Sequence, residues 1–102
     1  MASLLCVVNH KSRHGAATAR AEKILAICDE LGVHHQVIDL TADDFQDQLE
    51  QSLTQAVFDA VVGIGGDGTH HTAANAMLAI HAAQPNQPLP PYALVPCGTG
   101  ND

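Results

Sequence analysis

The sequence contains few aromatic and few basic residues. Aromatic side chains make up 3% of its 102 residues and tryptophan is absent, so the core has to be built from Ala, Val, Leu and Ile. Only four residues are Lys or Arg, and all of them lie between positions 11 and 23. Nucleic-acid binding needs a broad basic face, and a polybasic membrane anchor needs a longer run of cations. We therefore expect neither, whereas the small basic cluster suits either a small anionic ligand or an ordinary solvated helix face.

Cysteine pairs and long hydrophobic runs are also lacking. The three cysteines are Cys6, Cys28 and Cys97. Their spacing is not that of a metal site, and an odd number of cysteines cannot all pair in disulfides, which favours a reduced, cytoplasmic setting. The apolar run at 4–8 is too short for a signal peptide or a transmembrane segment. Seven histidines are present, but no Cys or Glu stands at ligand spacing beside them, so we expect no zinc site.

Apolar periodicity alternates along the chain between strand and helix. Residues 4–8, 36–40, 59–64 and 92–95 predict strands, the first of them covered on both faces because its apolar run is continuous. Gly32 is placed to end the first helix, and Thr41 with an acid three residues later predicts a capping-box-like start of the second. The three helical stripes comprise Ala17, Ala21, Ile24, Leu25, Cys28 and Leu31; Phe45, Leu49, Leu53 and Ala56; and Ala73, Ala76, Met77, Ile80 and Ala83.

This β-α-β-α-β-α-β order predicts the α/β class. Strands separated by helices form a parallel sheet with right-handed crossovers and helices on both faces, which is a Rossmann-like three-layer sandwich. The chain ends at Asp102, inside a turn that follows the fourth strand, where a sheet of this kind needs a further element. We therefore expect residues 1–102 to be a partial domain.

A glycine-rich turn at 63–69 (GIGGDGT) connects the third strand to the third helix. Glycine lets another group approach the backbone closely, and the free N–H groups and the dipole of a helix start favour an anion. We therefore interpret the turn as a phosphate site. The GxGxxG pattern within it is weak evidence for a dinucleotide fold, which also needs an acid about 20 residues later; none occurs between Gly68 and Asn101. A P-loop would need Lys where Thr69 stands.

Asp67 lies among the expected phosphate contacts. A carboxylate beside phosphate oxygens is repelled unless a cation intervenes. Mg²⁺, which takes one or two carboxylates together with phosphate oxygens, is the simplest candidate. A hydrogen bond to a ligand hydroxyl and a helix-capping role are the alternatives. We therefore take Asp67 as the candidate catalytic residue and Mg²⁺ ligand.

Four turns follow the carboxyl ends of the four expected strands, and they begin near Asn9, Thr41, Gly65 and Gly98. In an open parallel sheet these ends share one edge, where ligands bind, so we expect the turns to converge on one crevice. Lys11 in the first turn would meet a phosphate there. Phosphoryl transfer needs mainly positioning and charge neutralisation from the protein. The plain alternatives are a helix cap at Thr41 and a closed turn at Asn9.

Three segments resemble the diacylglycerol-kinase-like lipid kinases. GGDGT at 65–69 resembles the nucleotide loop that this family shares with NAD kinases and, more loosely, with phosphofructokinases. PCGTGND at 96–102 resembles the PxGTxND motif of the lipid kinases, which NAD kinases lack, and NHKS at 9–12 resembles their NPxS turn. Order and spacing agree over all 102 residues. The sequence departs from the family where His71 and Thr72 replace Asn-Glu after GGDGT.

The resemblance implies a kinase, cytoplasmic or at the membrane surface, that transfers the γ-phosphoryl group of ATP to a lipid hydroxyl with Mg²⁺. Its partners would be the nucleotide and a diacylglycerol-like lipid. The residues that would bind the nucleotide are Asn9, Lys11, Ser12, Thr41, Gly65, Gly66, Asp67, Gly68, Thr69, Gly98, Thr99 and Asn101.

The likeness also implies a division of the full protein. Residues 1–102 would be the N-terminal, partial nucleotide-binding α/β domain of the lipid kinase and NAD kinase-like fold. The family's β-sandwich domain, which carries the acceptor site and the proposed catalytic base, is not in this chain, so the isolated piece should be inactive. The alternatives are an NAD kinase or another kinase of the superfamily, or a non-catalytic nucleotide-binding regulatory module, which the residues at 71 and 72 permit.

Overall fold

The computed structural model describes residues 2–11 and 15–97. Strands and helices alternate along this part of the chain, as the sequence predicts. They are β1 (Ser3–Val8), α1 (Ala16–Leu31), β2 (His34–Asp39), α2 (Phe45–Gln55), β3 (Ala60–Gly65), α3 (Asp67–Ala83) and β4 (Tyr92–Pro96). The strands form a four-stranded sheet in the order β2-β1-β3-β4, and every pair is parallel. The α/β class is confirmed.

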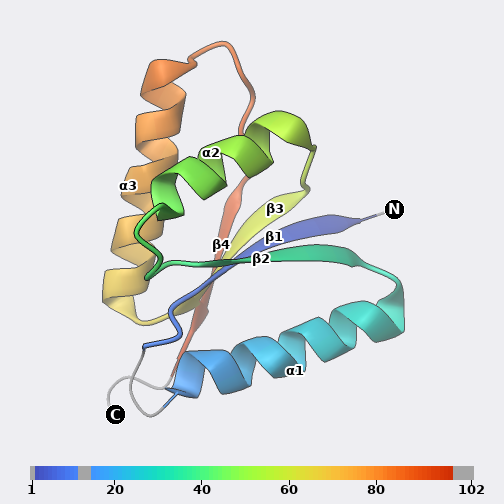
Figure 1. The fold of residues 1–102 in the computed structure, drawn as a ribbon. Helices are drawn as coiled ribbons and strands as arrows, with labels where there is room; N and C mark the ends of the chain where they lie inside the picture. The colour runs from blue at the N-terminus through green and yellow to red at the C-terminus, as the bar shows by residue number, and fades with distance from the viewer. Residues whose placement is uncertain (1, 12–14, 98–102) are drawn as a thin grey trace.

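The sheet is covered on both faces. Figure 1 shows α1 on one face and α2 and α3 on the other. Successive residues of a strand point to opposite faces, so Leu5 and Val7 of β1 join the core beneath α2 and α3, while Cys6 and Val8 join the core beneath α1. All four are 0% exposed. The central strand is therefore buried on both faces, and the Rossmann-like three-layer sandwich is confirmed.

The apolar stripes of the helices are shorter than the sequence predicts. Leu31, the last residue of α1, is 72% exposed. Ala83, the last residue of α3, is exposed, and so is Ala56, which lies beyond α2 as its C-cap with extended backbone. The prediction that these three residues face the core is wrong because each stands where the chain is already turning toward the next strand. Gly32 does end α1: its φ of 71° is left-handed, and its N–H bonds the last turn.

The helix α2 begins later than the predicted capping box. Its N-cap is Asp44, and no side chain caps it. The Thr41 hydroxyl instead donates to Asp39 Oδ1 at 2.7 Å, and the Thr41 N–H donates to the same oxygen at 2.9 Å. The carboxylate at the end of β2 therefore binds the hydroxyl that was expected to cap the helix, and the predicted cap is wrong.

The register of the strands brings their carboxyl ends to one level. Val8 pairs with Asp39 on one side and with Ile64 on the other, and Gly65 pairs with Pro96. The segments that follow the strands therefore start along a single rim of the sheet, which we call the carboxyl edge.

Candidate functional site

The first turn of α3 presents backbone N–H groups at the carboxyl edge. Gly66 is the N-cap, and no side chain caps the helix. The His70 N–H bonds the Gly66 carbonyl at 3.2 Å, which leaves the N–H groups of the three residues in between without an intrahelical partner. Two of these residues, Asp67 and Gly68, are exposed. Since the helix dipole adds partial positive charge, this turn suits a phosphate group.

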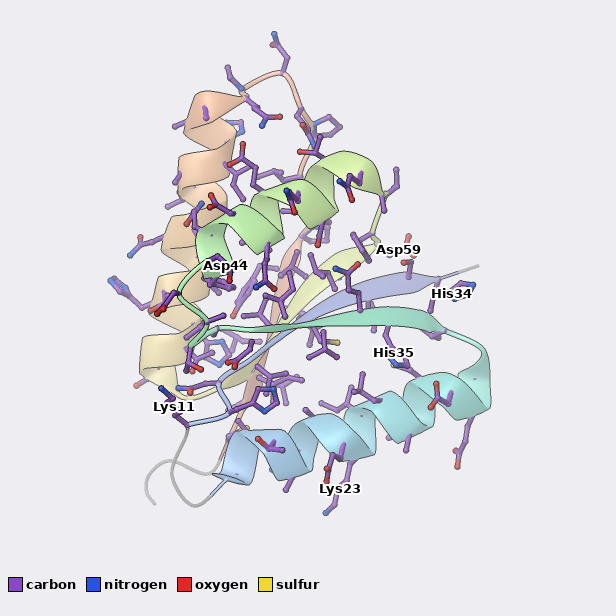
Figure 2. All side chains as sticks on the ribbon, in the orientation of Figure 1. Lys11, Lys23, His34, His35, Asp44 and Asp59 are labelled. Atoms are coloured by element: carbon purple, nitrogen blue, oxygen red, sulfur yellow. The ribbon has the colours of Figure 1, made fainter. Side chains whose placement is uncertain are left out.

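Asn9 connects the turn after β1 to the start of α3. Its side-chain N–H₂ donates to Thr69 Oγ1 at 3.3 Å, and its Oδ1 accepts the backbone N–H of Lys11 at 2.9 Å. Its own backbone N–H extends the sheet to the Ile64 carbonyl at 3.4 Å. Figure 2 shows Lys11 on the same edge as the start of α3. One amide side chain thus holds the cation-bearing loop beside the open N–H groups.

Gly65 leaves room for Thr69 rather than for a ligand. The Thr69 side chain is 3% exposed, its Oγ1 overlaps the place of a Cβ at residue 65, and its own Cβ lies 2.7 Å from that place. Positive φ is not the reason, because among the described residues only Gly15 and Gly32 are glycines with positive φ. Because Thr69 is buried and its hydroxyl accepts the hydrogen bond from Asn9, its side chain has a structural role in this turn.

The loop after β2 adds a carboxylate at the same edge. Asp39 accepts both hydrogen bonds from Thr41, and these hold the pKa of Asp39 below its usual range. Burial opposes this shift, and the charges of His10 and Lys11, whose effects are weaker than that of burial, lower the pKa further. Asp39 is therefore ionised at neutral pH, and it shapes the loop that carries Thr41. Asp39 is not among the site residues that the sequence predicts, although an acid near the carboxyl end of the expected second strand at 36–40 is a usable signal.

Asp67 carries the only carboxylate within the 65–69 turn. Its side chain is exposed in the first turn of α3. Within residues 2–11 and 15–97, no three His, Cys, Asp or Glu side chains are grouped so that they could hold a metal ion. Mg²⁺, however, is commonly held by one or two carboxylates together with phosphate oxygens. A lone exposed carboxylate beside open N–H groups fits an ion that arrives with a nucleotide.

The fourth turn lies largely outside the described residues, as do the predicted site residues Ser12, Gly98, Thr99 and Asn101. The last described residue, Cys97, donates its N–H to the Gly65 carbonyl at 3.1 Å, so the segment after β4 begins beside the glycine turn. The Cys97 thiol is 6% exposed, and burial raises its pKa while the Arg20 charge lowers it. Cys97 thus serves as a buried packing residue.

A cavity of about 630 Å³ lies away from this edge, between the second half of α3 and the loop that leads to β4. Met77, Leu78 and Leu89 are among its lining residues, and none of the sequence-predicted site residues borders it. Because its walls are mainly apolar, it does not suit a polyphosphate. The carboxyl edge is therefore the candidate site.

Comparison with known families decides between the kinases that share a GGDGT loop. Residues 3–102 match the model of the family described as "Diacylglycerol kinase catalytic domain". The chain belongs to this family. No curated protein sequence matches the chain. Membership in the diacylglycerol kinase catalytic domain family confirms the resemblance seen at 9–12, 65–69 and 96–102, and it makes this a kinase-type enzyme of the lipid kinase class. Of the helices in the described ranges, none is both long and apolar enough to cross a bilayer.

Proposed function

We propose that this segment supplies the nucleotide-binding loops of an ATP-dependent lipid kinase, which transfers the γ-phosphoryl group of ATP to the hydroxyl group of a diacylglycerol-like lipid. The observation that carries the proposal is the Asn9–Thr69 hydrogen bond of 3.3 Å. It joins the loop of Lys11 to the uncapped start of α3, so that a cation and free N–H donors lie along the same edge. Such a combination is what phosphate oxygens bind.

Each turn has a role in this proposal. The backbone N–H groups of 66–69 bind phosphate oxygens, and the Lys11 ammonium group offsets their charge. Thr41, held by Asp39, contacts the nucleotide from the loop after β2. By the family's motifs, Ser12 completes the first turn, and Gly98, Thr99 and Asn101 close the pocket. The acceptor lipid would be bound, and the catalytic base would be supplied, by parts of the protein beyond this segment. Residues 1–102 alone should therefore not transfer phosphate.

Asp67 is the residue that would hold Mg²⁺ together with the phosphate oxygens. Bound there, Mg²⁺ would neutralise charge on the phosphates during phosphoryl transfer. Among the described residues, the Asp67 side chain makes no hydrogen bond or ion pair that would give it a structural role. Its carboxylate is therefore available to a ligand.

The proposal is tested with the intact protein, labelled ATP, Mg²⁺ and vesicles that contain diacylglycerol. Asp67→Asn should abolish phosphoryl transfer and leave the unfolding temperature almost unchanged, because the side chain is exposed. Asp47→Asn is a matched control, since Asp47 is an exposed acid in the first turn of α2 and loses the same small dipole interaction, about 0.3–1 kcal/mol. It should leave transfer intact.

Three results would contradict parts of the proposal. Wild-type turnover in Asp67→Asn would remove the role of Asp67. Phosphorylation of NAD in place of lipid would indicate another kinase of the superfamily. ATP binding without any transfer would favour a non-catalytic regulatory module, which His71 and Thr72 at the family's Asn-Glu positions permit.

A further inference from the structure

His70, the residue after Thr69, contacts β4, the strand that lies next to β3 on the side opposite β1. Its Nδ1 lies 2.8 Å from the Tyr92 hydroxyl oxygen, and the two rings meet edge to face with centroids 5.9 Å apart and an interplanar angle of 75°. The other ring nitrogen, Nε2, is buried and has no hydrogen-bond partner among the described residues. The contact with Tyr92 is therefore the interaction that orients this imidazole.

Gly63 is what allows Tyr92 to reach His70. A Cβ at residue 63 would overlap the Tyr92 hydroxyl oxygen and would lie 3.1 Å from His70 Nδ1. Gly63 lies within β3 and pairs there with Leu94, so the need for glycine comes from this close approach of a side chain. The first glycine of the 63–69 turn thus serves an internal contact rather than a ligand.

Tyr92 is suited to a fixed contact. It is the first residue of β4, and its partly buried side chain packs against the core beneath α2 and α3. Burial raises the pKa of Tyr92 to about 12, so the phenol is protonated at neutral pH and is able to donate a hydrogen bond to His70. A rigid ring with two rotatable bonds loses little conformational freedom when it forms such a bond.

Two neighbouring residues at the start of α3 are thus each held from a different side. Asn9, which follows β1, bonds Thr69, and Tyr92 of β4 bonds His70; β1 and β4 flank β3 in the sheet. We propose that Tyr92 and His70 are positioning residues that form the second arm of a clamp on the phosphate-binding turn. The expected effect of this clamp on nucleotide affinity rests on the proposed function, whereas its expected effect on the rigidity of the turn does not.

The rigidity of the turn is tested by amide hydrogen exchange on the intact, nucleotide-free protein. Tyr92→Phe keeps the ring and removes the hydroxyl. Amide exchange depends on the equilibrium between the closed and the locally opened helix start, and a neutral hydrogen bond changes such an equilibrium by about a factor of five. The amides of 70–72 should therefore exchange about five-fold faster in Tyr92→Phe, while those near the end of α3 exchange at the wild-type rate. Equal protection of 70–72 in wild type and variant overturns the proposal, whether or not the protein is active.

The effect on nucleotide binding is tested by kinetics on the same variants. Tyr92→Phe should raise the KM for ATP about three- to ten-fold, with a smaller change in kcat and none in the KM for lipid. His70→Asn, which keeps a hydrogen-bonding group near the position of Nδ1, should recover most of the affinity that His70→Leu loses. His81→Leu, near the other end of the same helix, is the control and should match wild type.

The two failures can be told apart. If the wild-type protein does not bind ATP, the proposed function is wrong, and the exchange rates still decide whether the clamp exists. If the wild-type protein uses ATP and Tyr92→Phe has the same KM for ATP, the positioning role is wrong while the proposed function stands.

Discussion

Replacing Gly65 by alanine tests how closely α3 is packed against the end of β3. The added Cβ would lie 2.7 Å from Thr69 Cβ and 2.9 Å from its Cγ2, and both residues are fixed by secondary structure. Overpacking of this kind costs about 1–3 kcal/mol. Displacing Thr69 also weakens its hydrogen bond with Asn9, which contributes about 0.5–1.5 kcal/mol. We therefore expect Gly65→Ala to lower the free energy of unfolding by about 2–4 kcal/mol.

Urea denaturation of the intact protein measures this change, with Gly68→Ala as the matched control. A Cβ at Gly68 meets nothing within 4 Å, and alanine is favoured over glycine inside a helix by up to about 1 kcal/mol. Gly68→Ala should therefore be neutral or slightly stabilising. Close packing of Thr69 against Gly65 is refuted if Gly65→Ala unfolds at the same urea concentration as wild type, or if the two variants lose equal stability.

Three further predictions concern side chains at the carboxyl edge and the clamp. Asn9→Ala should lower the free energy of unfolding by about 1–2 kcal/mol in urea denaturation and should weaken ATP binding in calorimetry, because it releases Thr69. Thr41→Val should raise the pKa of Asp39 toward 3.8 in a ¹³C-carboxyl titration. In the wild-type protein the lowered pKa of Asp39 stabilises the folded state above pH 3.8, and this stabilisation is lost as the pH falls through the folded-state pKa. The Tyr92 phenol should titrate near pH 12 in ¹³Cζ NMR, and stability should fall as pH rises from 10 to 12, since the unfolded chain ionises first.

The strands and the layers could be predicted because their cause is local. A run of apolar residues such as Leu5–Val8 has to be covered on both faces, and helices between strands force parallel pairing. The ends of the helices could not be predicted in this way. The helical period continues through Leu31 and Ala56 in the sequence, but burial depends on where the neighbouring elements stop, which is not a local property.

The candidate site was predictable in outline and not in its contacts. Strand ends in a parallel sheet share an edge, so the meeting of the turns after β1, β2 and β3 follows from the order of elements. The side-chain bonds do not follow, because they depend on register: Asn9 reaches Thr69 across 60 positions. The interpretation of the glycines was incomplete for the same reason, since the side chains that fill the space at Gly63 and Gly65 belong to Tyr92 and Thr69.

If the turns at the carboxyl edge bind the phosphates of a nucleotide, the backbone amides of these turns must respond to the ligand. NMR of the ¹⁵N-labelled intact protein during titration with ATP and Mg²⁺ measures this response. We expect saturable shifts of the amide signals of 66–69 and of Lys11, with the signals near the cavity at the far end of α3 unchanged. Saturable ATP binding that leaves the amides of 66–69 unperturbed, or no binding at all, would contradict phosphate binding at this edge.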